Sequence, residues 1–290
     1  MATRTVTQSI EGRPTSDGAG VKLTRSIGSA EHLRVDPFLM LDEFASDDAA
    51  DYIGGFPSHP HRGFETVTYM LDGHMLHEDH MGNRGDLRPG DVQWMTAGRG
   101  VVHSEMPQQT EGRMRGFQLW INLPAAEKMK PAAYRDIGAA EIPVVALPAG
   151  GKARVIAGTL YVGSETTEGP INAETAGLST DPLYFDIELP ANSVFTHAVV
   201  PEYSAFLYVF EGTASVGDTP LQTHSAGVLS DGERVEIVAG AEGARFLLLA
   251  GRPLNEPVVQ YGPFVMNTRE EIEQAMSDYA NGSLTTIAKT

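Results

Sequence analysis

Short apolar or alternating runs recur along this chain between turn residues, and this rhythm limits the folds that it can adopt. The runs are VKLTRSI, TVTYML, GDVQWM, FQLWINL, ARVIAG, LYFDIEL, SAFLYVFEG, GVLS, RVEIVA and ARFLLLAG. Gly, Pro, Asp and Asn stand at the joints between them, and the chain has 31 Gly and 18 Pro. Spacing of this kind is typical of the strands of a sandwich or barrel. We therefore predict an all-β fold.

The length of 290 residues predicts two domains, and both halves follow one plan. TVTYMLDG is followed by RPGDVQWM in the first half, and SAFLYVFEG is followed by GVLSDGERVEIV in the second. A strand closing on D-G or E-G, and then a strand entered through a G-D or D-G turn, indicates an internal duplication. The stretch between the halves has no long periodic run and carries Pro143, Pro148 and a Gly pair. We predict an N-terminal domain over residues 1–135, a linker over 136–150 and a C-terminal domain over 151–290.

The C-terminal domain is expected to end in a short amphipathic helix. Thr268 and Glu271 form a capping box, and Gly282 stands past the end of the pattern. Apolar residues recur between them at helical spacing, namely Ile272, Ala275, Met276 and Tyr279. This stripe should be buried against the body of the protein.

Charge and composition exclude several classes of function. The chain has 21 Lys and Arg against 38 Asp and Glu, a formal charge of −17, and no Lys/Arg-rich run. We therefore expect no direct nucleic-acid binding, and a protein partner is the expected route to any role in transcription. No apolar run is long enough to span a bilayer, and the first residues lack the apolar segment of a secretory signal. These features predict a cytoplasmic protein without membrane contact.

Two His-containing pairs point to a metal site. The chain has no Cys, so any metal must be held by His and carboxylate. His59 and His61 are two residues apart, as are His103 and Glu105, and in a strand this spacing puts both side chains on one face. Two such pairs on facing strands would supply four ligands. Three imidazoles and a carboxylate suit Fe(II), Mn(II), Ni(II), Cu(II) or Zn(II) better than Mg²⁺ or Ca²⁺.

The spacing leaves a second carboxylate open as the ligand. Glu65 lies at an even offset from His61, so it would share the same strand face. A further cluster, HMLHEDH, contains His74, His77 and His80. In a strand, His77 would point away from the other two, so we expect these to be ordinary surface or cavity histidines, and we expect the same of the isolated residues His32, His197 and His224.

Several motifs resemble those of the pirin family within the cupin superfamily. They are FLMLDEF, GGFPSHPHRGFETVTYMLDG, PGDVQWMTAGRGVVHSEM, LWINLP followed by EKM, and GPFVMNT. The resemblance runs nearly end to end. It implies a bicupin, with two β-barrel or jelly-roll domains.

The resemblance also implies the ligands. In pirins a mononuclear iron is bound by the positions that are here His59, His61, His103 and Glu105. Glu65 would then have a structural role beside the site, and we expect Arg62 to pair with it.

Similarity to bacterial pirins implies a quercetin 2,3-dioxygenase-like reaction. A flavonol and O₂ would give a ring-opened depside and carbon monoxide, with Glu105 acting both as ligand and as the base for the flavonol hydroxyl. The alternative is a non-enzymatic, iron-dependent redox-sensing regulator that acts through a protein partner. The C-terminal domain offers no ligand pair at strand spacing, so we predict that it binds no metal.

Overall fold

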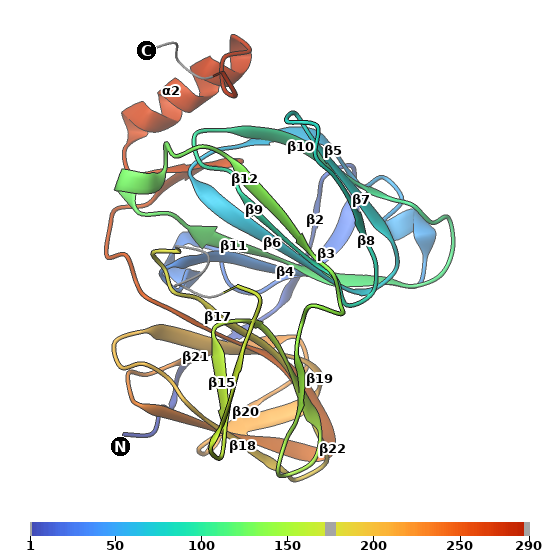
Figure 1. Ribbon diagram of the computed structural model, residues 1–290, viewed down its shortest axis with the longest axis vertical. Coiled ribbons are helices and arrows are strands. Elements are labelled where there is room, and N and C mark those ends of the chain that lie inside the picture. Colours follow the sequence, from blue (N-terminus) through green and yellow to red (C-terminus); the bar gives the residue numbers. More distant parts are fainter. Residues whose placement is uncertain (1, 172–177, 287–290) are drawn as a thin grey trace. The chain divides into compact units, whose positions relative to one another are not determined.

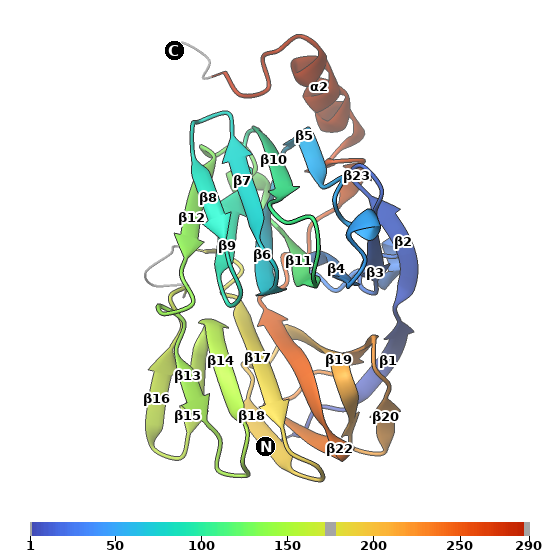
Figure 2. The same cartoon turned by 90° about the vertical axis from the view of Figure 1, so that its right-hand side faces the viewer.

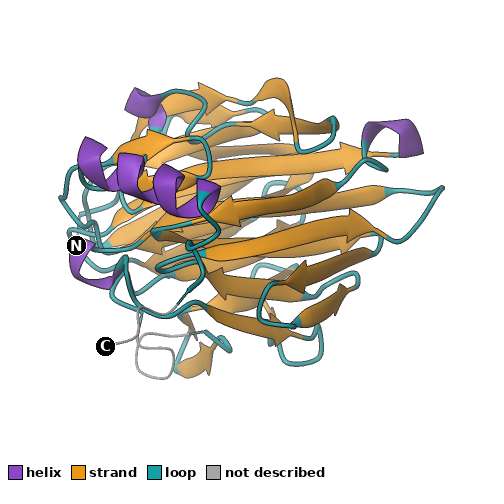
Figure 3. Cartoon of the chain, turned by 90° about the horizontal axis from the view of Figure 1, so that it is seen from above, coloured by secondary structure: helices purple, strands orange, loops and turns teal. Residues whose placement is uncertain are grey.

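The computed structural model describes residues 2–171 and 178–286, which are mostly β-strand, and this confirms the all-β expectation (Figures 1 and 3). These residues form two compact units. The N-terminal unit comprises residues 14–25, 39–139 and those from 254 on. The C-terminal unit comprises residues up to 13, 26–38 and 140–253.

The strands of the N-terminal unit are β2 (Arg13–Asp17), β3 (Val21–Arg25), β4 (Phe38–Ser46), β5 (Phe56–His61), β6 (Phe64–Asp72), β7 (Met75–Asp79), β8 (Arg84–Leu87), β9 (Val92–Thr96), β10 (Val101–Pro107), β11 (Met114–Asn122), β12 (Ala133–Ile137), β23 (Val259–Tyr261) and β24 (Phe264–Met266). One α-helix, α2 (Arg269–Ala280), is assigned in the described residues. Short 3₁₀ turns lie at Glu31–Leu33, Ala49–Asp51 and Ala125–Glu127.

The strands of the C-terminal unit are β1 (Val6–Glu11), β13 (Val144–Ala146), β14 (Lys152–Ala157), β15 (Thr159–Val162), β16 (Glu165–Glu168), β17 (Leu183–Leu189), β18 (Val194–Ala198), β19 (Ser204–Val216), β20 (Thr219–Leu221), β21 (Ser225–Leu229) and β22 (Arg234–Gly251).

The units differ from the expected domains at both ends of the chain. β1 pairs with β21, which places the first strand in the C-terminal unit. Helix α2 belongs to the N-terminal unit, because its Ile272 and Ala275 pack with Phe264 and Met266. The expected linker also contains β13, which pairs with β14. Regular periodicity could not reveal these exchanges, since they depend on pairing between distant segments.

Two antiparallel sheets make up most of the N-terminal unit (Figure 2). One has the order β12-β9-β6-β11-β4-β3-β2, and the other has the order β5-β10-β7-β8. A core cluster joins residues from both, including Leu23 of β3, Met70 of β6, Met75 of β7 and Leu87 of β8. Alternate residues of each strand point into this core, so a His-x-His or His-x-Glu pair can point inward together.

The C-terminal unit has a larger sheet with the path β1-β21-β19-β22-β17-β14-β13, to which β18 and β20 are added. Its long strands β19 and β22 bend where the register shifts between Gly212 and Ala214. A Cβ on Gly212, whose φ is +65°, would lie 2.2 Å from the Gly243 carbonyl oxygen, so this bend requires glycine. Apolar side chains such as Phe185, Leu207 and Phe246 fill the interior.

Helix α2 has the predicted capping box at Thr268 and Glu271. Its stripe is only partly buried, because Met276 and Tyr279 are 41% and 44% exposed. The expectation that the whole stripe is buried is therefore wrong for these two residues. None of the helices in the described part of the chain has the length and apolar character needed to cross a bilayer.

Candidate metal centre

Strands β5 and β10 lie next to each other in one sheet and bring the two predicted pairs together. They pair antiparallel, with His103 opposite His59 and Val101 opposite His61. A register shift follows His103, and beyond it Glu105 lies opposite Phe56. The pairs are thus on neighbouring strands, where side chains of opposed residues share a face.

Three of the four predicted ligands form a compact triad. The ligand atoms of His59, His61 and His103 all lie within 4.8 Å of one another. Their ring centroids are 4.4 to 4.9 Å apart. His61 and His103 are buried, and His59 is half-buried. The triad therefore forms a candidate site for a metal ion.

The hydrogen bonds of the triad leave its lone pairs facing one another. His59 Nδ1 donates to the Pro57 carbonyl at 2.8 Å, and His61 Nδ1 donates to the Pro263 carbonyl at 3.4 Å. Since a carbonyl only accepts, the proton of each neutral ring is on Nδ1, and the two Nε2 atoms, which then carry lone pairs, lie 3.0 Å apart. A cation between them would relieve this repulsion. The donor set therefore fits a metal ion.

His103 completes the set. Its Nε2 is buried and has no hydrogen-bond partner within the described residues. Burial, followed by the nearby imidazoles, holds the pKa of His103 well below its ordinary value, and burial likewise lowers the pKa of His61. Both rings are neutral at physiological pH, which is the form that binds a metal.

Glu105 is buried on β10, two residues beyond His103, but it is not part of the 4.8 Å cluster found among the described residues. Thr68 Oγ1 donates to Glu105 Oε1 at 2.9 Å and also lies 2.6 Å from Gln118 Oε1. The Thr68 hydroxyl has one proton, so it serves one of these acceptors at a time. It thereby links the carboxylate of Glu105 to the amide of Gln118.

The rival carboxylate, Glu65, is engaged elsewhere. It accepts hydrogen bonds from Trp94 Nε1 at 3.3 Å and Thr96 Oγ1 at 2.6 Å. Burial raises the pKa of Glu65. The expected pairing of Arg62 with Glu65 is wrong, because Arg62 Nη1 binds Asp278 Oδ2 at 2.7 Å. The Arg62 side chain therefore contacts α2.

His77 is not the ordinary histidine that we expected. It is buried on β7, opposite Glu105 of β10, and its Nδ1 lies 3.3 Å from His103 Nδ1. If His103 donates across this contact, its Nε2 is left free for a metal. His74 instead binds Asp86, and His80 Nδ1 accepts from the Val102 amide. The three histidines do not converge, as the strand alternation predicted.

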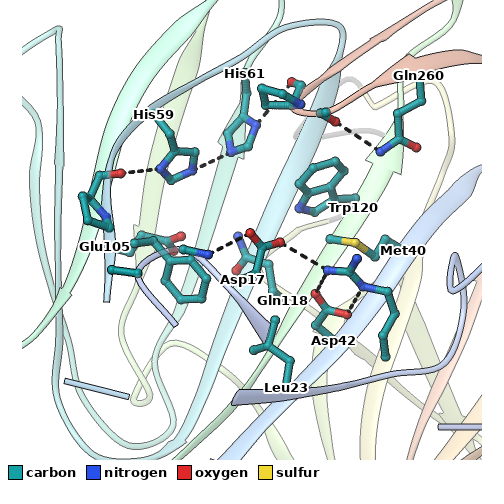
Figure 4. Close-up of a pocket in the computed structure, with 17 residues that line it drawn as sticks. Asp17, Leu23, Met40, Asp42, His59, His61, Glu105, Gln118, Trp120 and Gln260 are labelled. Carbon is teal, nitrogen blue, oxygen red and sulfur yellow. Dashed lines mark hydrogen bonds and ion pairs between the residues drawn. The ribbon is translucent and has the colours of Figure 1, made fainter. Parts of the chain in front are cut away.

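A cavity of about 600 Å³ opens beside His59, His61 and Glu105 (Figure 4). Its apolar lining includes Leu23, Met40 and Trp120, and the Trp120 ring packs edge-on against His61 with centroids 5.3 Å apart. Its polar lining residues include Asp17, Arg25, Asp42, Gln118 and Gln260.

Sequence reasoning missed most of these cavity residues. Met40, Asp42 and Pro263 nevertheless lie within the stretches FLMLDEF and GPFVMNT, which carried the family resemblance. Those two stretches therefore meet at one cavity. Their resemblance to the family was the feature of the sequence that could have identified these cavity residues.

One strand pair of the C-terminal unit carries the buried His197. β18 pairs with β22 so that His197 lies opposite Val235 and Phe195 lies opposite Ile237. On the face of this strand pair that carries His197, the neighbouring residues are therefore Phe195, Val235 and Ile237, none of which has a side chain that binds metal. That the C-terminal half binds no metal remains a prediction.

Comparisons with known proteins agree with this architecture. Residues 20–121 match the pirin family model, and residues 184–285 match the model of the pirin C-terminal cupin domain. A Pseudomonas aeruginosa protein, provisionally named a quercetin 2,3-dioxygenase, is 53% identical over 94% of this chain and 95% of its own length. A pirin-like protein of Caulobacter vibrioides is 51% identical over 97% of this chain and 99% of its own.

A crystal structure of quercetin 2,3-dioxygenase from Acinetobacter baumannii is similar along the whole chain. It superposes with a TM-score of 0.87 at 35% identity and covers 99% of this chain and 100% of its own. Both halves of the chain thus have the cupin fold. Together the two matched models and these full-length relatives show that the chain belongs to the pirin family.

Proposed function

We propose that this protein is a metal-dependent dioxygenase that opens the central ring of flavonols, in a quercetin 2,3-dioxygenase-like reaction. The observation that carries the proposal is the compact cluster of His59, His61 and His103, in which His59 and His61 line a cavity of about 600 Å³. That volume suits a small organic molecule. The names of the Pseudomonas and Acinetobacter relatives support a flavonol as the substrate.

His59, His61, His103 and Glu105 would hold the metal, with Fe(II) as the first choice and Mn, Ni, Cu or Zn compatible with the same donors. When bound, such an ion would supply a Lewis acid beside the cavity. The backbone carbonyls of Pro57 and Pro263 orient two of the imidazoles. The carboxylate would come from β10, since Glu65 is held by Trp94 and Thr96.

Glu105 would also act as the general base. Thr68 donates to its Oε1, which leaves Oε2 to take the proton of the flavonol 3-hydroxyl. Leu23, Met40 and Trp120 would pack against the flat rings and exclude water from them. In the net reaction, flavonol and O₂ give the depside and carbon monoxide, so every atom of both reactants is accounted for.

The direct test is metal analysis and oxygen uptake. Protein purified without added metal should hold one first-row ion per chain, and with quercetin it should consume one O₂ for each CO released. His59→Ala should lose both metal and turnover, whereas His80→Ala, which alters an exposed histidine of the same unit, should keep both. A protein that retains its metal and binds a partner but consumes no oxygen with any flavonol would instead be the regulator.

A further inference from the structure

One wall of the cavity carries a fixed guanidinium between two carboxylates (Figure 4). Arg25 on β3 binds Asp42 on β4 through two bonds of 2.7 Å, from Nε to Oδ1 and from Nη2 to Oδ2. Arg25 Nη2 also donates to Asp17 Oδ2 at 3.3 Å. Asp42 is 2% exposed, so the bidentate pair anchors Arg25 rigidly in the wall.

Two groups on this wall have unused hydrogen-bonding capacity. Arg25 Nη1 has no hydrogen-bond partner among the described residues. It is also not one of their fully buried atoms without a partner, so it is accessible from solvent. Asp17 Oδ2 accepts only from Arg25, while its Oδ1 is fixed by the Gly18 amide at 2.7 Å. A carboxylate oxygen has two acceptor sites, so Oδ2 keeps one free. A free donor thus stands beside a free acceptor.

The wall lies across the cavity from the imidazoles. Figure 4 shows Asp17 and Asp42 on the side opposite His59 and His61, with Trp120 between them at the edge. A flat molecule that has one end at the triad would therefore present its other end to Arg25 and Asp17.

We propose that Asp17 and Arg25 select flavonols that carry two adjacent hydroxyls on the ring attached to carbon 2. One hydroxyl would donate to Asp17 Oδ2, and the oxygen of its neighbour would accept from Arg25 Nη1. The fused ring of common flavonols fits this wall less well, since its hydroxyls are not adjacent and one is already bonded to the carbonyl. This inference rests on the proposed function, which places the 3-hydroxyl at the triad.

The test compares three flavonols that differ only in that ring, and a fourth that differs only in the fused ring. Quercetin has two adjacent hydroxyls there, kaempferol has one and galangin has none, while fisetin keeps the pair but lacks a hydroxyl on the fused ring. Hydrogen bonds to charged groups predict a KM for galangin about ten- to a hundredfold above that for quercetin, with kaempferol between them. Fisetin should match quercetin within about threefold.

Asp17→Asn is the discriminating variant, because it keeps volume and the Oδ1 acceptor for Gly18 but replaces the acceptor at Oδ2 by a donor. It should reduce the quercetin preference to about twofold or less. Asp72→Asn is the matched control, since Asp72 pairs with Arg113 at 3.7 Å on the surface and does not line the cavity. It should keep the full preference.

Dissociation constants measured anaerobically on the holoenzyme, by quenching of tryptophan fluorescence, separate this inference from the proposed function. If all flavonols are turned over and bound alike, the recognition by Asp17 and Arg25 is refuted while the dioxygenase stands. If no flavonol is turned over, yet quercetin binds preferentially and Asp17→Asn abolishes the preference, the proposed dioxygenase activity is refuted and the recognition by Asp17 and Arg25 is supported. Absence of both binding and turnover overturns both.

Discussion

The ion pair between Arg62 and Asp278 ties helix α2 to the segment that carries His59 and His61, and its removal has a calculable cost. Arg62 Nη1 lies 2.7 Å from Asp278 Oδ2, with side-chain exposures of 4% and 22%. Arg62 is otherwise bonded to the carbonyls of Arg99 and Leu284. Asp278→Asn keeps the shape but leaves a buried guanidinium with only neutral acceptors.

The expected cost lies between two known limits. Breaking a fully buried ion pair costs about 3–5 kcal/mol, and a single hydrogen bond to a charged group contributes about 1.5–3 kcal/mol. Because Asp278 is partly exposed and Asn still offers one acceptor, we expect the free energy of unfolding to fall by about 1.5–3 kcal/mol.

The loss should depend on pH in a defined direction. Burial alone would raise the pKa of Asp278, but the hydrogen bonds from Arg62 and Gln274 outweigh it and hold this pKa below its ordinary value of 3.8. A carboxyl whose folded-state pKa is depressed contributes stability at neutral pH and loses it as the pH falls through that pKa. Wild type and Asp278→Asn should therefore converge in acid below pH 3.8.

Urea unfolding of the two proteins gives the measurement. The control is Glu273→Gln, which removes an exposed partner of Arg269 on the same helix, 3.4 Å away. It should change stability by about 0.5 kcal/mol or less. If Asp278→Asn loses no more than Glu273→Gln, the ion pair does not hold the helix and the reasoning fails.

Three further predictions concern other parts of the molecule. Burial lowers the pKa of His197 from 6.5 to about 4. As the pH falls, the unfolded chain takes up a proton on this histidine before the folded chain does, so the free energy of unfolding should fall by about 3 kcal/mol between pH 6.5 and about pH 4. In urea unfolding measured over this pH range, His197→Phe should remove the dependence. Ile272→Ala should lower the free energy of unfolding by about 2–4 kcal/mol, whereas Met276→Ala, which alters an exposed residue, should lower it by about 0.5 kcal/mol or less. Equal losses would contradict the observed packing of the helix. Elemental analysis should give one metal ion per chain, and two would contradict the prediction that the C-terminal half binds no metal.

The strand content and the triad were predictable because both depend on local spacing. A period of two residues puts His59 and His61 on one face whatever their neighbours are. The choice between Glu65 and Glu105 was not predictable in this way, since both satisfy the same parity. Sheet pairing separates them: Glu65 on β6 reaches Trp94 and Thr96 of β9.

Features that depend on contacts between distant segments could not be predicted from the sequence. Arg25, Asp42 and Pro263 reach one cavity from separate parts of the chain, and no local pattern relates them. His77 was set aside because its parity differs from that of His74 and His80, yet that parity turns it toward His103. The place of α2 likewise depends on its packing with β24, which helical periodicity cannot specify.

The most direct test of the proposed mechanism is oxygen consumption by the two carboxylate variants after each has been refilled with Fe(II). Glu105→Gln keeps the volume but removes the charge and basicity, so we predict that it retains metal weakly and does not turn over quercetin even at full occupancy. Glu65→Gln should keep most of its metal and activity, since its partners are Trp94 and Thr96. An active Glu105→Gln protein alongside a metal-free Glu65→Gln protein would contradict the assigned ligand and the assigned base together.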